Sequence, residues 1–206
     1  MKSKSIQEQF GQELIDAVAR FAKKEIGTPE QLEEQDFKHV ADNELRKALA
    51  ETLYGARWLY KLGLALLANG DEQSAHVRVQ VIDYASICEA LLADMIVQAH
   101  AKGVLAGDQH TFFDVRKKSP MNWGADPRTS IHKTTFEWRI IVSQESGIID
   151  SSLATSLHTI RNHRNTVHLT LKIREGVAYY AGMARRAHTA MRVLISQTQK
   201  WTKSLD

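Results

Sequence analysis

Residues 157–170, LHTIRNHRNTVHLT, place five arginine and histidine side chains in a stretch with helical spacing. These residues are His158, Arg161, His163, Arg164 and His168. A histidine that titrates near neutral pH takes up or delivers a proton. An arginine stabilises charge on a phosphate through its paired N–H donors. The residue types therefore indicate acid–base chemistry on a substrate that contains a phosphate.

A helical projection at about 100° per residue places some of these side chains together. The apolar face comprises Leu153, Leu157, Ile160, Val167 and Leu171. Arg164 falls within this face, Arg161 and His168 lie at its edge about 20° apart, and Asn165 lies beside them. On one helix, Arg161 and His168 are expected two turns and about 10.5 Å apart. One such pair is too extended to hold a single phosphate.

An arginine next to an apolar face needs a carboxylate partner, because an unpaired buried charge is costly. Glu89, in YASICEALLADMI, shares a face with Ile82, Ala85, Ala93 and Ile96 and has the same requirement. We therefore expect Glu89 to accept hydrogen bonds from Arg164 or Arg161, with the pair of Glu89 and Arg164 serving a structural purpose.

The elements that must position these residues all read as helices. Three prolines and eleven glycines are few, and no alternating β pattern occurs. Thr28, Pro29 and Gln31 form a capping box, and Asp42 caps a further helix that Gly70 ends. Helices are predicted at about 5–26, 42–70, 72–102, 130–146, 149–172 and 176–203. The sequence predicts an all-α, up-and-down bundle of about five to six helices.

The composition of the chain indicates the cellular compartment in which the protein is expected. Hydrophobic residues make up 43% of the 206 residues, and the most apolar run, WLYKLGLALLANG, contains Lys61 and is too short to span a bilayer. The start of the chain has no apolar segment of signal-peptide length. The single cysteine, Cys88, excludes an internal disulfide and a thiolate cluster. We expect a soluble protein in the reducing cytoplasm, without membrane contact.

Charge is distributed unevenly along the chain. Residues 1–110 carry 12 lysines and arginines against 17 acidic residues, a net charge of −5, whereas residues 111–206 carry +8 from 15 against 7. A basic half favours a polyanionic partner. The alternative is that the two halves neutralise each other in the fold.

The stretch RNHRNTVH, Arg161 to His168, resembles the motif of the HEPN superfamily. That motif is an arginine, often followed by asparagine, with a histidine a few residues later in a helical bundle. TFEWRIIVSQESGIIDSSLATSLHTI is similar to the approach to the motif, and IDYASICEALLADMI to an earlier helix with an acidic residue. The resemblance covers roughly 45–200, so we divide the chain into an N-terminal helical arm (1–41) and a HEPN-like bundle (42–206).

The resemblance implies metal-independent RNA cleavage by a homodimer in which two motifs face each other, with no cofactor. It implies that His168 transfers a proton and that Arg161 stabilises the phosphate. Asn165 would orient one of them, and His158 and His163 would be dispensable. A second Arg-Asn pair, at Arg164, lies closer to His168 than the family spacing, so the choice of arginine stays open. Thr170 stands where antitoxin-paired members have tyrosine, which argues against that subgroup.

A long connection, HTFFDVRKKSPMNWGADPR, mixes aromatic and basic side chains that suit unpaired RNA bases. The candidates for RNA contact are Arg116, Lys117, Lys118, Trp123 and Arg128. The alternative is that its aromatic residues only anchor this connection to the bundle. The histidines 158, 163 and 168 point in different directions, so no metal site is expected.

The sequence thus predicts an endoribonuclease, acting as a toxin or defence effector with a possible neutralising protein partner. Two alternatives remain open. One is a non-catalytic HEPN module that binds a nucleotide, RNA or a protein. The other is a helical regulator in which the motif occurs by chance.

Overall fold

The computed structural model describes residues 5–107 and 121–205, and all regular structure in these ranges is helical. The predicted all-α class is confirmed. The helices are α1 (Ile6–Phe10), α2 (Gln12–Lys23), α3 (Pro29–Asp36), α4 (Asn43–Ala65), α5 (Gly70–Ala101), α6 (Pro127–Ile131), α7 (Phe136–Glu145), α8 (Ser151–Asn165), α9 (Leu169–Glu175) and α10 (Ala181–Lys203). Within the described ranges, none of them is long and apolar enough to cross a bilayer.

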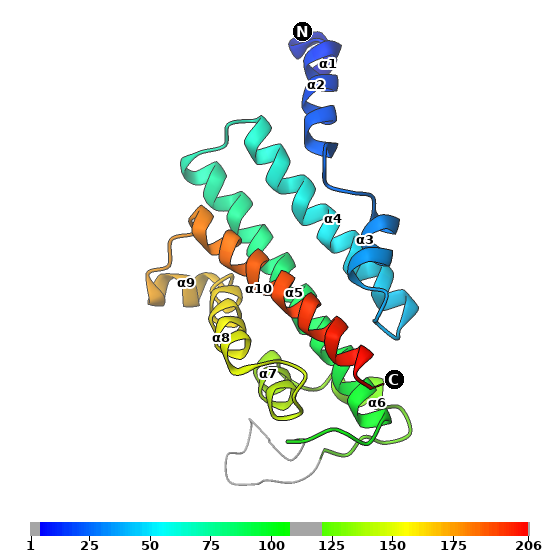
Figure 1. Cartoon of the computed structure of the whole chain (residues 1–206). Helices are drawn as coiled ribbons and strands as arrows, with labels where there is room; N and C mark the ends of the chain where they lie inside the picture. The colour runs from blue at the N-terminus through cyan, green and yellow to red at the C-terminus, as the bar shows by residue number, and fades with distance from the viewer. Residues whose placement is uncertain (1–4, 108–120, 206) are drawn as a thin grey trace.

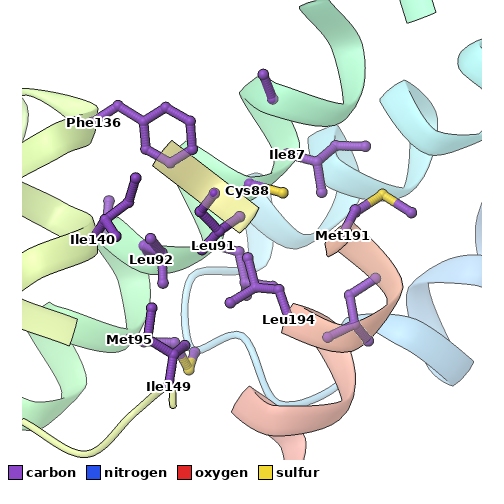
Figure 2. Close-up of a cluster of buried hydrophobic side chains, with 14 of the residues drawn as sticks. Ile87, Cys88, Leu91, Leu92, Met95, Phe136, Ile140, Ile149, Met191 and Leu194 are labelled. Carbon is purple, nitrogen blue, oxygen red and sulfur yellow. The ribbon is translucent and has the colours of Figure 1, made fainter. Parts of the chain in front are cut away.

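Helix α5 is the centre of the bundle. It packs against α4, α7, α8 and α10, with α4 on one side and α7 and α8 on the other in Figure 1. Its apolar residues point in several directions, as its sequence predicts for a helix that others surround. Figure 2 shows the main core, to which α5, α7 and α10 contribute Ile87, Cys88, Leu91, Leu92, Met95, Phe136, Ile140, Met191 and Leu194.

Two predicted helix starts are confirmed. The Thr28 hydroxyl accepts a hydrogen bond from the Gln31 N–H, and the Thr28 backbone N–H donates one to the Gln31 side-chain oxygen. The Asp42 carboxylate caps α4 by accepting from two backbone N–H groups. The predicted role of Gly70 is wrong, because α4 ends at Ala65 and Gly70 begins α5. The left-handed turn between these helices is made by Leu67, with φ of 52°.

The boundary predicted at residue 41 does not separate two cores. Leu32, Phe37 and Val40 belong to the main core, because α3 packs on α4. Only α1 and α2, split at Gly11, extend past the end of the bundle (Figure 1). Their large apolar side chains are partly exposed, as at Phe10, 61% exposed, and Leu14, 54% exposed.

The C-terminal half contains more breaks than the sequence predicts. The single helix expected at 130–146 is two, α6 and α7, and the helix expected from residue 176 begins at Ala181. Helix α10 packs through Ala184, Ala187, Met191, Leu194 and Ile195, whereas Ala181 is exposed. The described residues contain ten helices because the expected helices at 5–26, 130–146 and 149–172 are each broken in two and α3 forms a separate short helix.

Candidate functional site

Helix α8 positions the Arg/His stretch. Its start is fixed by Asp150, whose carboxylate accepts a hydrogen bond from the Leu153 N–H (2.8 Å) and another from the Gln197 side chain of α10 (2.6 Å). The helix then buries Leu153, Ala154, Leu157 and Ile160 against the bundle. The predicted apolar face is therefore confirmed for this part of α8, and it directs the C-terminal end of α8 to a defined place.

The predicted continuous helix over 149–172 is wrong. Helix α8 ends at Asn165, and His168 is the N-cap of the next helix, α9. Residues 166–168 form three successive turns with i→i+3 hydrogen bonds, the last from the His168 N–H to the Asn165 carbonyl. Residues three apart are nearly eclipsed in such turns, so His168 is aligned with Asn165 more closely than with Arg161.

The expected ion pair of Glu89 is present. Arg164 Nη2 donates to Glu89 Oε2 at 3.3 Å, which joins the end of α8 to the middle of α5. The Arg164 side chain keeps 39% of its surface exposed, so its guanidinium is anchored and still reachable by solvent. Arg161 does not contribute to this pair.

A second arginine on Glu89 was not predicted. Arg139 of α7 lies 3.7 Å from the Glu89 carboxylate and donates to the Glu89 backbone carbonyl (3.1 Å). Its other donors reach the carbonyls of Ile131 and Thr134 and the Thr134 hydroxyl. Burial lowers the pKa of Arg139, and Glu89 opposes that effect. The position of Arg139 inside the apolar run FEWRIIVSQ is the sequence signal that predicts a buried arginine in need of a carboxylate.

Arg161 is held by a different carboxylate. Its guanidinium contacts Glu137 of α7 and donates to the Asn162 side-chain oxygen (3.1 Å). The Arg161 side chain is 21% exposed, and its Nε is buried without a hydrogen-bond partner among the described residues. Of the two candidate arginines, Arg161 is therefore the more enclosed.

The histidines have different surroundings. His168 is exposed at the junction of α8 and α9. His158 and His163 are partly buried, and burial is the main cause that lowers the pKa of each; a nearby arginine (Arg161 for His158, Arg186 for His163) adds to the effect. Both are therefore mainly neutral at pH 7. No group of metal-binding side chains forms in residues 5–107 or 121–205, so the described part of the chain gives no support for a metal site.

A groove of about 390 Å³ runs between α8 and α10 beside this stretch. Its walls include the hydroxyls of Ser156 and Thr159 together with His163, Arg185 and Arg186. No carboxylate among the described residues forms an ion pair with Arg185 or Arg186, although Arg186 lies over the Tyr180 ring. The groove adds cationic surface that reading α8 by itself did not reveal.

The five candidates for RNA contact differ in where the structure places them. Arg116, Lys117 and Lys118 lie outside the described residues. Trp123 is only 9% exposed and stacks on His100 at 4.3 Å between ring centroids, so it does not present a free face to a base. Its aromatic ring anchors the connection to the bundle, as the alternative expectation held.

Arg128 also has a structural contact that sequence reading missed. Its guanidinium lies 2.9 Å from the Asp42 carboxylate and 3.3 Å from the fully buried Asp94 carboxylate. Two acidic groups therefore neutralise Arg128, and this contact ties α6 to α4 and α5. Trp123 and Arg128 therefore both have packing contacts in the structure, and their contact with RNA stays a prediction.

The arrangement gathers one exposed histidine and two carboxylate-held arginines at the end of α8. Such a set suits proton transfer and phosphate binding, whereas the fully buried Cys88 thiol, whose pKa burial raises, is unsuited to nucleophilic attack. Comparison with known proteins gives no family model that matches the chain, and no curated protein or solved structure with significant similarity.

Proposed function

We propose that the chain is a metal-independent endoribonuclease of HEPN type, acting as a toxin or defence effector. The observation that supports this proposal is the end of α8, where exposed His168 follows Arg161 and Arg164. The 2′-oxygen attacks the phosphorus, and the bond from phosphorus to the 5′-oxygen breaks. The products are a 2′,3′-cyclic phosphate and a free 5′-hydroxyl. His168 transfers a proton at the 2′-hydroxyl or the leaving oxygen, and Arg161 stabilises the phosphate.

The proposed site is composite. Arg161 and His168 are seven residues apart on either side of the end of α8, and no hydrogen bond joins them in the described residues. A second copy of the chain brings a facing pair that completes the set, which predicts a homodimer with α8 near its two-fold axis. Light scattering that showed a stable monomer at micromolar concentration would contradict this part of the proposal.

The test is cleavage of a labelled RNA by the purified chain in EDTA. We expect products with a 2′,3′-cyclic phosphate or its 3′-phosphate hydrolysis product. His168→Ala and Arg161→Ala should each lower the rate by about 10² or more, from the usual size of acid–base and electrostatic effects. His158→Ala serves as the matched control and should cleave at close to the unaltered rate. A folded His168→Ala protein with full activity would refute the assignment.

A non-catalytic module is the second candidate function, and the contact between Arg161 and Glu137 favours it. A phosphate must displace Glu137 or share the guanidinium with it. In that case the cationic end of α8 binds RNA, a nucleotide or an acidic protein without cleaving. RNA binding without cleavage, and unaffected by His168→Ala, would identify this alternative.

A further inference from the structure

A second cavity lies on the other face of α10, away from the groove along α8. It encloses about 500 Å³ between α4, α5 and α10. Binding sites for small molecules usually occupy about 300–1,000 Å³. The rim is open at Tyr60, 52% exposed, and the floor is closed by Gln80 and Tyr84, each 4% exposed. The space is therefore a pocket with depth rather than a shallow surface depression.

The charged side chains that line the cavity, among the described residues, are all cationic. Arg57 and Arg185 line the cavity, and no aspartate or glutamate is among the described residues that do so. Arg57 is held from behind, because its Nη1 donates to the Ile26 carbonyl (3.1 Å) and its Nη2 lies 4.0 Å from Asp36. Two arginines that line one cavity are suited to an anion, since a guanidinium offers paired N–H donors.

The other residues that line the cavity suit a ligand with a planar, partly apolar ring. Tyr60 and Tyr84 contribute aromatic rings, and the side chains of Gln80 and His76 contribute polar groups. His76 Nδ1 is buried and has no hydrogen-bond partner among the described residues. A buried polar atom of this kind normally has a partner, so the His76 ring is an unsatisfied polar group in the wall of the cavity beside the tyrosines.

Gly63 of α4 lies next to the His76 ring in the wall of the cavity. A Cβ at Gly63 would lie 3.4 Å from His76 Nδ1, in ordinary van der Waals contact with the ring. Glycine at this position therefore brings the α4 backbone close to the His76 ring.

We propose that this cavity binds a small organic anion that carries a planar ring. The shared chemistry is a phosphate or carboxylate bound by Arg57 and Arg185, with the ring lying against the tyrosines and meeting His76 and Gln80. Ribonucleoside monophosphates and aromatic carboxylates are the two sources of this chemistry. The proposal does not depend on RNA cleavage.

The test is calorimetric titration of the full chain with matched probes. The probes are the four common ribonucleoside monophosphates and benzoate, each compared with its uncharged counterpart (a nucleoside or benzamide), together with inorganic phosphate. At least one ring anion should bind below about 1 mM and at least ten-fold more tightly than its uncharged counterpart and than phosphate. Binding by no ring anion, or equal binding of the uncharged counterpart or of phosphate, would overturn the proposal.

Neighbouring arginines provide the matched variants. Arg185 and Arg186 both line the groove along α8, but only Arg185 also lines the cavity. Arg185→Gln should weaken binding of the ring anion at least ten-fold, whereas Arg186→Gln should change it less than two-fold. His168→Ala should leave the affinity unaltered, which separates this cavity from the proposed nuclease site. Equal losses in Arg185→Gln and Arg186→Gln, or loss in His168→Ala, would place the ligand elsewhere and refute the proposal.

Discussion

Carboxylates determine which arginines of the C-terminal half remain available to a phosphate. Glu89 engages Arg139 and Arg164, and Glu137 engages Arg161. Arg139 is enclosed and has several backbone acceptors, so it fixes the position of Glu89 rather than meeting a substrate. Arg164 shares the Glu89 carboxylate, but its side chain is more exposed than that of Arg139. Of these two arginines, Arg164 is therefore the alternative to Arg161 as the residue that binds the phosphate.

Replacing Glu89 tests this network. Glu89→Gln should lower the free energy of unfolding by about 1–3 kcal/mol, because two guanidinium groups lose their carboxylate. The effect stays below that of a fully buried pair, since the Arg164 side chain is 39% exposed. Urea denaturation measured by circular dichroism gives the free energy directly.

Glu137→Gln is the matched control for that measurement. Its pair with Arg161 is also an arginine contact to α8, but the Glu137 side chain is 37% exposed, compared with 21% for Glu89. Partly exposed pairs contribute about 1 kcal/mol or less, so the loss should be smaller. Equal losses of unfolding free energy in Glu89→Gln and Glu137→Gln would show that the ion pairs of Glu89 stabilise the fold no more than the pair of Glu137 and Arg161.

The sequence predicted the partner of a side chain correctly where a charged residue lay on the apolar face of a helix. Glu89 and Arg164 both break such faces, so their pairing followed from the cost of an unpaired charge. Arg139 obeys the same rule and could have been predicted. Trp123 could not, because an aromatic residue among basic ones suits either a base or a core, and only the contact with His100 decides.

The end of α8 illustrates what helical periodicity leaves out at the scale of elements. No glycine or proline lies between residues 148 and 175, so the two strongest stop signals are missing near Asn165. The structure supplies another reason for the end. The Thr166 hydroxyl donates to the His163 carbonyl (2.7 Å) and lies 2.9 Å from the Tyr179 hydroxyl, which fixes the turn to the segment before α10.

The hydroxyl pair of Thr166 and Tyr179 can be tested by a double-mutant cycle. Thr166→Val and Tyr179→Phe should each lower the free energy of unfolding by about 1 kcal/mol, the usual size of a buried hydrogen bond. Their effects should not add, because either change removes the same contact between hydroxyls. Chemical denaturation of the three variants measures the coupling. Strictly additive losses would mean that this contact does not hold the turn.

At the scale of the whole molecule, ion pairs among the described residues offset part of the charge asymmetry between the halves. Ion pairs join Asp36 to Arg192, Asp94 to Arg128 and Glu89 to two arginines. Three acidic residues of the first half therefore pair with four arginines of the second. The expectation of a polyanionic partner stays a prediction. Among the described residues, Arg185 and Arg186 beside the groove along α8 form no ion pair with a carboxylate and keep their charge for such a partner.

Acid sensitivity is a property of the whole fold that follows from His39, which joins the segment before α4 to α10. Its Nε2 lies 2.8 Å from the Thr198 hydroxyl, and its Nδ1 is buried without a partner among the described residues. Burial lowers the pKa of His39 from 6.5 to about 4, although Asp94 and Asp36 favour the charged ring. Below pH 6.5 the unfolded chain therefore binds a proton that the folded chain does not accept until about pH 4.

Because the unfolded state binds more protons in this window, the free energy of unfolding should fall as the pH decreases from 6.5 towards 4. His39→Gln removes the titrating group, so the decrease should become smaller in that variant. His158, His163 and His188 also have lowered pKa values and supply the part that persists. Urea titrations at pH 7.5, 6 and 5 measure both slopes. An NMR titration of His39 in the folded protein with a midpoint near 6.5 would contradict the burial argument, since an accessible ring would then protonate without opposing the fold.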